Sequence, residues 1–212
     1  MDAASMVDEQ LVPRGITDQR VLAAMRSVRR HRFVPIQYRL SAYYDGPLPI
    51  GYGQTISQPY IVALMTQLLE TEPEATVLEI GTGSGYQAAV LAELVKHVYT
   101  VETIKELADR ARKVLESEGY TNVTVYHRDG SYGLPEHAPY DRIMVTAAAP
   151  RVPDQLKDQL ADGGVMVIPI GPAYGVQVLR QIRRVKDDFE WTDREYVRFV
   201  PFTGGVSQSE DE

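Results

Sequence analysis

The chain of 212 residues contains no cysteine and only four histidines. Without cysteine it can form no disulfide, no thiolate metal site and no cysteine nucleophile. The histidines lie far apart and match no HExxH-like spacing, so we expect no bound metal. No apolar run approaches the roughly 18 residues of a membrane span, and the N-terminus lacks the basic start and apolar run of a secretory signal. These absences predict a cytoplasmic protein without a membrane partner.

Positive charge is also scarce: 22 Lys and Arg face 29 Asp and Glu, which gives a net charge of -7. Such a balance weakens non-specific attraction to nucleic acid, so we expect no nucleic-acid partner. The length and the absence of repeats or linkers predict one domain over residues 1–212, acting as a monomer. We expect a loose arm at residues 1–10 and a polar acidic tail at residues 207–212.

One basic cluster stands out against this background. It comprises Arg26, Arg29, Arg30, His31 and Arg32. We interpret it as a solvated helix end, where cations are favoured by the helix dipole. A docking surface for an acidic partner is the alternative.

Strands and helices alternate from Thr76 onward, which predicts parallel βαβ units with helices on both faces of one sheet. A helix after a cap at Thr17 or Asp18, an ordered loop over 39–59 and a helix over 60–70 precede this part and should cover it. The sequence therefore predicts an α/β, Rossmann-like, doubly wound and mostly parallel sheet with an antiparallel C-terminal edge. The expected strands are 76–80, 97–102, 122–127, 142–146, 165–169, 176–184 and 194–200, with a late helix at about 153–160.

A glycine-rich turn is the sharpest signal, because it follows a predicted strand and opens a predicted helix. Its glycines permit positive φ and close approach of a ligand, and the helix N-terminus behind them offers unpaired N–H groups. The next strand ends at Glu102, whose carboxylate can accept both hydroxyls of an adenosine ribose. We therefore predict a cofactor site that contains Gly81, Thr82, Gly83, Ser84, Gly85 and Glu102.

The acid Glu79, just before this turn, distinguishes between possible cofactors. It would repel a pyrophosphate but suits the ammonium group of S-adenosylmethionine (AdoMet). A dinucleotide site would also place a glycine where this chain has Tyr86. After the third strand, Asp129 and Gly130 are expected near the adenine, although Asp-Gly is also a common turn. The sequence thus favours AdoMet, with S-adenosyl-L-homocysteine as product.

A second motif is the loop from Gly51 to Pro59, which gathers Gln54, Thr55, Ser57 and Gln58 within five residues. Alone, it could be a tight turn with local hydrogen bonds. Combined with the AdoMet turn, it resembles the G-x-G-Q-T-I-S-x-P loop of the protein-L-isoaspartate (D-aspartate) O-methyltransferase family. The resemblance extends over the segments 21–35, 44–59, 77–87, 140–150 and 198–201.

The resemblance implies an AdoMet-dependent methyltransferase that repairs proteins. The family methylates the free α-carboxylate of L-isoaspartyl residues in damaged proteins and peptides, and the ester then closes to a succinimide that can reopen to aspartate. By the same resemblance, Ser57 is the active-site serine, and Thr55, Ser57 and Val200 contact the substrate. Further cofactor contacts are implied at Thr55, Ile56, Gln58, Thr203 and Gln208.

Three other functions are alternatives. They are an AdoMet methyltransferase for small molecules or nucleic acid, a nicotinamide-dependent oxidoreductase, and a non-catalytic AdoMet-binding protein. The 51–59 loop argues against the first and Tyr86 against the second, and the intact cofactor turn and hydroxyl loop make the third less attractive. An acceptor carboxylate has a pKa near ~4 and needs no general base, which fits a motif without acid–base groups. We therefore expect Ser57 to position the acceptor and not to abstract a proton.

Overall fold

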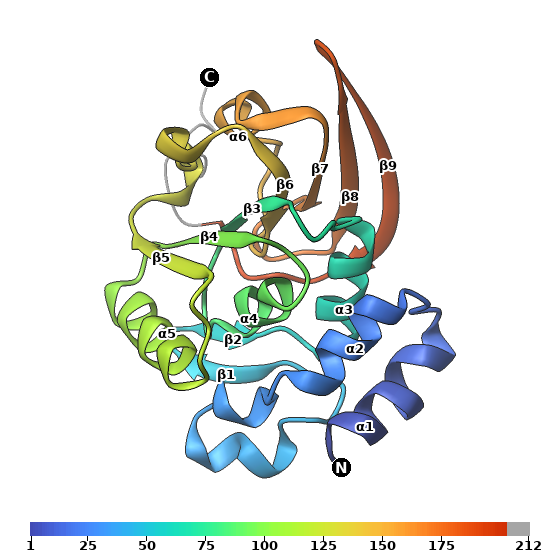
Figure 1. The fold of residues 1–212 in the computed structure, drawn as a ribbon, viewed down its shortest axis with the longest axis vertical. Helices are drawn as coiled ribbons and strands as arrows, with labels where there is room; N and C mark the ends of the chain where they lie inside the picture. The colour runs from blue at the N-terminus through green and yellow to red at the C-terminus, as the bar shows by residue number, and fades with distance from the viewer. Residues whose placement is uncertain (203–212) are drawn as a thin grey trace.

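The computed structural model describes residues 1–202. A sheet of seven strands forms its centre, in the order β5-β4-β3-β6-β7-β8-β9 (Figure 1). The pairs from β5 to β7 are parallel, and β8 and β9 are antiparallel to their neighbours. This confirms the doubly wound sheet with an antiparallel edge. The strands are β3 (Thr76–Ile80), β4 (His97–Glu102), β5 (Val123–His127), β6 (Tyr140–Val145), β7 (Leu160–Ile170), β8 (Gln177–Val185) and β9 (Asp188–Val197).

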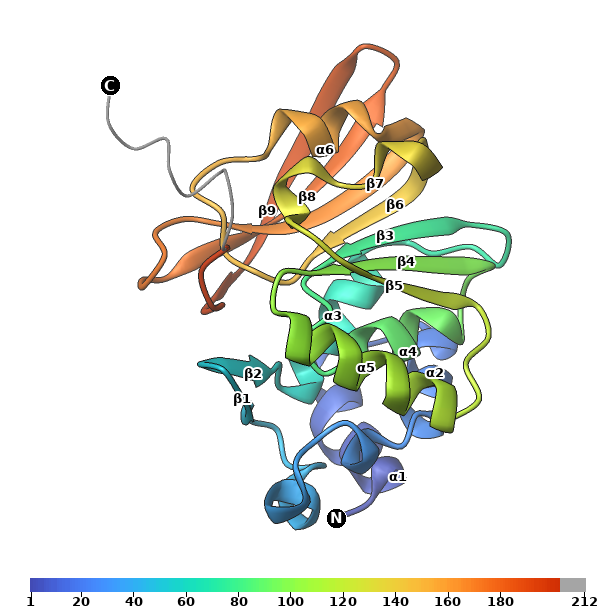
Figure 2. The same ribbon diagram turned by 90° about the vertical axis from the view of Figure 1, so that its left-hand side faces the viewer.

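Helices cover both faces of the sheet (Figure 2). Helices α3, α4 and α5 lie over one face, with α2 behind them against α3 and α4, and α6 with short 3-10 turns lies over the other (Figure 2). Alternate strand residues point to opposite faces, so Val77 belongs to one apolar cluster while Leu78 and Ile80 belong to the other. The helices are α1 (Ala3–Met6), α2 (Gln19–Ser27), α3 (Pro59–Leu68), α4 (Tyr86–Ala92), α5 (Lys105–Ser117) and α6 (Asp154–Asp158).

The N-terminal residues are not the loose arm that we expected. Helix α1 continues into a π-helical turn, Val7–Leu11, and Met6, Val7 and Leu11 are fully buried in the core. The Asp2 side chain caps α1 by accepting a 2.9 Å hydrogen bond from the Ser5 N–H. Burial of these apolar side chains against the domain fixes the arm in place.

Two details of the C-terminal half also differ from expectation. Strand β9 begins at Asp188 and ends at Val197, earlier than the predicted 194–200, because it pairs with β8 along its length. Helix α6 is shorter than predicted. After β9 the chain returns toward the centre of the sheet, where the Ala148 N–H donates to the Val200 carbonyl at 2.8 Å. This return brings Val200 to the carboxyl end of β6.

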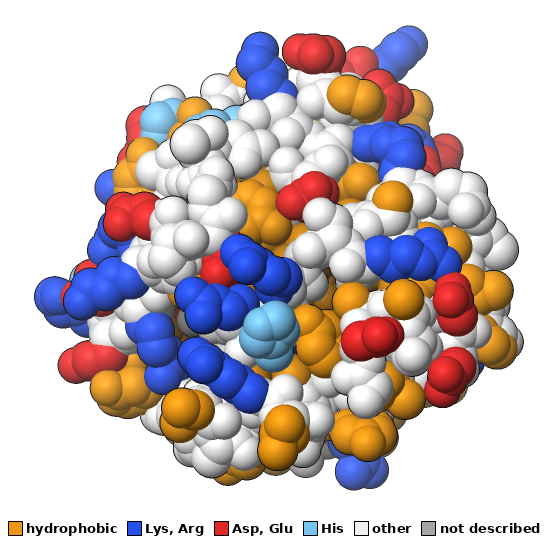
Figure 3. Space-filling view, turned by 60° about the horizontal axis from the view of Figure 1, so that its bottom comes forward, with side chains coloured by type: hydrophobic (Ala, Val, Ile, Leu, Met, Phe, Trp, Pro, Cys, Tyr) orange, Lys and Arg blue, Asp and Glu red, His pale blue; other side chains and the backbone are white. Residues whose placement is uncertain are grey.

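The basic cluster is only partly a solvated surface. Arg29 and Arg32 both bind the Glu118 carboxylate, at 2.7 and 2.8 Å, and Figure 3 shows Lys and Arg side chains gathered at this end of the molecule. Arg26 pairs with Asp8 at 2.6 Å. Arg30, in contrast, is fully buried, so the interpretation as a solvated helix end is wrong for this residue.

The segment 39–59 is ordered, as expected, and contains a small hairpin. Strand β1 (Leu48–Gly51) pairs antiparallel with β2 (Gln54–Ile56). Arg110 of α5 donates a hydrogen bond to the Ile50 carbonyl and ties this hairpin to the domain. Pro59 then starts α3, a position that suits proline because the first helical N–H has no partner. The hairpin thereby holds Gln54 to Ser57 beside the carboxyl ends of the parallel strands.

Among the helices of residues 1–202, none is long and apolar enough to cross a membrane.

Candidate active site

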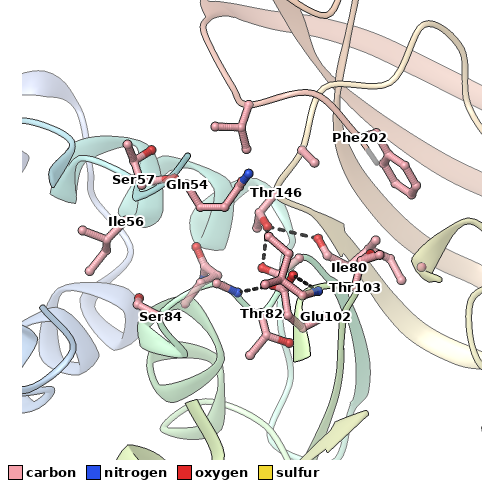
Figure 4. Close-up of a pocket in the computed structure, with 18 of the residues that line it drawn as sticks. Gln54, Ile56, Ser57, Ile80, Thr82, Ser84, Glu102, Thr103, Thr146 and Phe202 are labelled. Carbon is pink, nitrogen blue, oxygen red and sulfur yellow. Dashed lines mark hydrogen bonds between the residues drawn. The ribbon is translucent and has the colours of Figure 1, made fainter. Parts of the chain in front are cut away.

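A cavity lies where the strand order reverses, between β3 and β6. In open α/β sheets, ligands bind at this switch point, outside the carboxyl ends of the strands. The residues that follow β3, β4, β5 and β6 form its walls, and the hairpin closes one side (Figure 4). The predicted site residues that line it are Thr55, Ile56, Ser57, Gly81, Thr82, Gly83, Ser84, Glu102, Gly130 and Val200.

The glycine turn has the backbone geometry that its sequence predicts. Gly81, Gly83 and Gly85 all have positive φ, at 98°, 53° and 84°. A Cβ atom on Gly81 would lie 2.4 Å from Oγ1 of Thr146, so only glycine fits between the turn and the end of β6. Gly85 has a different role, because it is the N-cap of α4 and packs on α5 without lining the cavity.

Glu102 joins the glycine turn to the end of β4. Its Oε2 accepts a hydrogen bond from the Gly83 N–H at 2.8 Å, and its Oε1 accepts one from the Ile104 N–H at 3.0 Å. A carboxylate has about four acceptor sites, so these two bonds leave capacity for a ligand's hydroxyls. Glu102 is the one acidic or basic residue among the described residues that line this cavity.

Glu79 lies behind the cavity wall and does not line it. Its carboxylate is fully buried and accepts a 2.5 Å hydrogen bond from the Thr100 hydroxyl. The Thr100 hydroxyl lies 2.7 Å from that of Thr82, which does line the cavity. Burial raises the pKa of Glu79 to about 8, since removal from water disfavours the charged form. The two threonine hydroxyls thus connect Glu79 Oε2 to the cavity wall, while Glu79 Oε1 is buried without a hydrogen-bond partner among the described residues.

The segment after β5 contributes backbone to the cavity. Gly130 lines it, and a Cβ there would lie 2.6 Å from Cγ2 of Ile80. The Asp129 carboxylate accepts hydrogen bonds from the Ser131 N–H and hydroxyl, at 2.9 and 2.8 Å. Asp129 thus shapes this turn, and its contact with an adenine remains a prediction. The predicted contacts Thr203 and Gln208 lie outside the described residues.

A second hollow, a groove, adjoins the cavity on the side of β9. Gln58 lines this groove and not the cavity. The residues that line both hollows are Thr55, Ser57, Thr146 and Val200. A molecule in the cavity and a polypeptide in the groove would meet at these four residues.

Sequence reasoning missed several residues of the cavity wall. Thr103 and Ile104 follow Glu102 directly, so the strand-end acid was the signal that could have found them. Thr146 was seen as the end of a strand, but its side chain supports the glycine turn by donating to the Gly81 carbonyl at 2.7 Å. The other lining residues that were not predicted are Gln54, Val62, Met65, Ile80, Gln87, Val101, Ala147, Pro201 and Phe202.

The mostly parallel sheet with its antiparallel edge, the glycine turn with Tyr86 in place of a dinucleotide-type glycine, and the acid at the end of β4 fit the class of AdoMet-dependent methyltransferases. The chain belongs to the protein-L-isoaspartate(D-aspartate) O-methyltransferase family, whose model matches residues 2–207.

Individual relatives agree with this assignment. The chain is 54% identical to protein-L-isoaspartate O-methyltransferases of Opitutus terrae and Desulfotalea psychrophila, over 93% and 94% of its length and 85% and 92% of theirs. Among solved structures, it resembles a Plasmodium falciparum protein described as a protein-L-isoaspartate O-methyltransferase in complex with S-adenosyl-L-homocysteine. That match has a TM-score of 0.83 and 26% identity, and covers 96% of this chain and 99% of the other.

Proposed function

We propose that this chain transfers the methyl group of AdoMet to the free α-carboxylate of L-isoaspartyl residues in damaged proteins and peptides. The ester then closes to a succinimide, which reopens in part to normal aspartate, so the outcome is protein repair. Membership of the family supports this reaction. At the level of the site, the observation that carries it is the set of residues shared by the cavity and the groove, with Ser57 and Thr55 among them.

The residues around the cavity fit AdoMet. Gly81 and Gly83 line the cavity without side chains, so a ligand can approach their backbone closely. We assign the turn from Gly81 to Ser84 to the methionine part, Glu102 to the ribose hydroxyls, and Gly130 with Asp129 to the adenine. Ile56 would cover the cofactor from the hairpin. When bound, AdoMet supplies a methyl group on a sulfonium, which is strongly electrophilic.

The acceptor site needs side chains that orient the isoaspartyl carboxylate, and it needs no general base. A carboxylate is already ionised at neutral pH, since its pKa is near ~4. The one titratable side chain of the described cavity wall, Glu102, already accepts two backbone hydrogen bonds. We assign Ser57 and Thr55 to holding the isoaspartyl carboxylate, and Val200 to packing against the substrate chain. Correct placement alone can contribute up to roughly 7–11 kcal/mol to a rate enhancement.

Isoaspartyl-containing proteins and peptides are the partners that this activity requires.

We also propose that the chain works as a single-domain monomer in the cytoplasm, without nucleic acid or membranes. One apolar cluster extends from Met6 to Val197, which supports a single domain, and the net charge of -7 disfavours nucleic acid. Light scattering tests the oligomeric state, with 23.7 kDa expected for a monomer. Cell fractionation and filter binding test the compartment and nucleic-acid binding.

Conversion of an isoaspartyl peptide tests the repair function. The peptide is incubated with the chain and AdoMet, and the isoaspartyl and aspartyl forms are separated by reversed-phase chromatography. We expect accumulation of the normal aspartyl peptide that depends on AdoMet. If the isoaspartyl peptide persists while calorimetry shows that AdoMet binds, the fold and cofactor stand and the repair function is discarded.

A further inference from the structure

Arg30 is a buried cation that contacts the acceptor loop. Its side chain is 0% exposed, and a guanidinium removed from water costs several kcal/mol unless its surroundings compensate. Among residues 1–202, its hydrogen bonds go to two backbone carbonyls and to no carboxylate. Its Nη1 has no hydrogen-bond partner there. The Tyr86 ring and the more distant Asp45 carboxylate favour this charge, but neither forms an ion pair with it, so the backbone carbonyls are its direct hydrogen-bond partners.

The contacts of Arg30 join three parts of the site. Nε donates to the Ala42 carbonyl at 2.7 Å, in the segment that leads to the hairpin. Nη2 donates to the Ser57 carbonyl at 2.8 Å. The guanidinium carbon also lies 4.8 Å from the ring centroid of Tyr86, the first residue of α4 after the glycine turn. Arg30 is therefore in contact with the acceptor loop and with the first residue of α4, and it has no hydrogen bond to the cofactor turn among the described residues.

The bond to Ser57 fixes the direction of the next N–H group. The peptide unit between Ser57 and Gln58 is trans, so its carbonyl and its N–H point in opposite directions. The carbonyl is turned inward to Arg30, and the Gln58 N–H is consequently turned away from it. Gln58 lines the groove. Within residues 1–202 this N–H donates no hydrogen bond.

We propose that Arg30 is a positioning residue for methyl transfer, which holds the Ser57–Gln58 peptide unit so that the Gln58 N–H donates to the isoaspartyl carboxylate. This inference rests on the proposed function. Donation to the Ser57 carbonyl also polarises the peptide unit and strengthens its N–H as a donor. The positive charge of Arg30 attracts an anionic acceptor, and the pairing of the nearby Asp45 carboxylate with Arg14 limits the repulsion from that side. The methyl ester product is neutral and loses that attraction.

Substitution of Arg30 tests the role in catalysis. Arg30→Met removes both the charge and the bond to Ser57, and Arg30→Lys keeps the charge without the forked geometry. For Arg30→Met we expect kcat/KM for an isoaspartyl peptide to fall about 10–100-fold, mainly through KM, as for a lost charge-assisted hydrogen bond. Arg30→Lys should recover part of this loss. The Kd for AdoMet should stay within about three-fold, because the cofactor turn is not bonded to Arg30.

Arg29→Met is the matched control, because Arg29 is the exposed neighbour that pairs with Glu118. Its kcat/KM should stay within about two-fold of the unchanged chain, as for a surface ion pair. If Arg30→Met folds, binds AdoMet and shows a kcat/KM within about two-fold of the unchanged chain, the positioning role is overturned. Inactivity of the unchanged chain on the peptide would instead overturn the proposed function.

A spectroscopic test on the unchanged chain does not depend on the folding of any variant. The chain is labelled with 15N, saturated with S-adenosyl-L-homocysteine and titrated with an isoaspartyl peptide or with the same peptide as its α-carboxamide. The Gln58 amide proton should move downfield with the carboxylate peptide and much less with the carboxamide. An unmoved Gln58 amide at saturating carboxylate peptide would overturn the inference.

Discussion

The Glu102 carboxylate accepts a 2.8 Å hydrogen bond from the Gly83 N–H, so the acid at the end of β4 is bonded directly to the glycine turn after β3. Its other oxygen accepts from the Ile104 N–H at 3.0 Å. The acid therefore shapes the cavity as well as lining it. Two sequence signals, the glycine turn and the strand-end acid, form one structural unit.

Removal of the charge at Glu102 should weaken cofactor binding. In Glu102→Gln an NH2 group replaces one acceptor oxygen. This group cannot accept a hydrogen bond from a backbone N–H or from a ribose hydroxyl. A hydrogen bond to a charged group contributes about 1.5–3 kcal/mol, so AdoMet affinity by calorimetry should fall about 10–100-fold. Glu106→Gln, at an exposed position in the first turn of α5, is the control and should bind normally. Equal affinity in both variants would refute the assignment of Glu102.

Alanine at Gly81 should damage the site more than alanine at a glycine with similar φ elsewhere. Gly81 and Gly15 have φ of 98° and 89°, but a Cβ meets the Thr146 hydroxyl at Gly81 and nothing within 4 Å at Gly15. Both substitutions incur the left-handed backbone cost of about 1–2 kcal/mol. Only Gly81→Ala should also lose AdoMet binding, measured by calorimetry beside thermal unfolding. Similar binding by the two variants would show that close packing of the turn is not required.

Loss of the Ser57 hydroxyl should slow the reaction without changing its pH dependence. If Ser57 donates one hydrogen bond to a charged acceptor, Ser57→Ala should lower kcat/KM about 10–100-fold. The profile from pH 6 to 8 should be flat in both proteins, because an acceptor with pKa near ~4 is already ionised. A steep rise near neutrality that disappears in Ser57→Ala would instead indicate that Ser57 takes part in proton transfer.

Glu79 should make stability depend on pH. Burial raises its pKa from 4.5 to about 8, so between these values the folded chain holds a proton that the unfolded chain releases. The resulting stabilisation is fully present below pH 4.5 and is lost as pH rises toward 8, by up to about 1.4 kcal/mol per pH unit. Glu79→Gln lacks this group. Urea titrations give the free energy of unfolding of both proteins at each pH. The difference, unchanged chain minus variant, should fall as pH rises across this window. A constant difference would contradict the prediction.

Val200 should influence which substrates are accepted. It lines both the cavity and the groove, and glycine there removes apolar contact and adds backbone freedom. We expect Val200→Gly to change the ratio of kcat/KM among isoaspartyl peptides with different neighbouring residues, while AdoMet affinity is retained. A uniform change across all peptides would mean that Val200 supports the fold and not the selection of substrate.

The alternation of strands and helices was predictable because each buried strand and each amphipathic helix has its own local period. The glycine turn and Glu102 were also found, since their chemistry is concentrated in short motifs at strand ends. The N-terminal arm was misjudged because residues 1–11 contain, after Met1, only three large apolar residues, Met6, Val7 and Leu11, and their burial depends on packing against the later helices α2 and α3. Strand β9 has exposed residues along almost its whole length, so no alternation of apolar residues indicated where it begins.

The role of Arg30 could not be read from its neighbours in the sequence. It stands among exposed cations of the same kind, and its burial depends on carbonyl groups at Ala42 and Ser57, which are distant in the chain. For Glu79, in contrast, the sequence suggested a role in the site. Its position before the turn suggested a ligand contact, but the threonines between it and the cavity come from β4 and from the turn itself.

The most direct test of the central claim is transfer of a labelled methyl group from AdoMet to two peptides of identical sequence, one with L-isoaspartate and one with normal aspartate. We predict base-labile label on the isoaspartyl peptide, none above background on the aspartyl peptide, and a strong reduction in Ser57→Ala. Equal labelling of both peptides, or labelling of neither while AdoMet binds, would contradict the account.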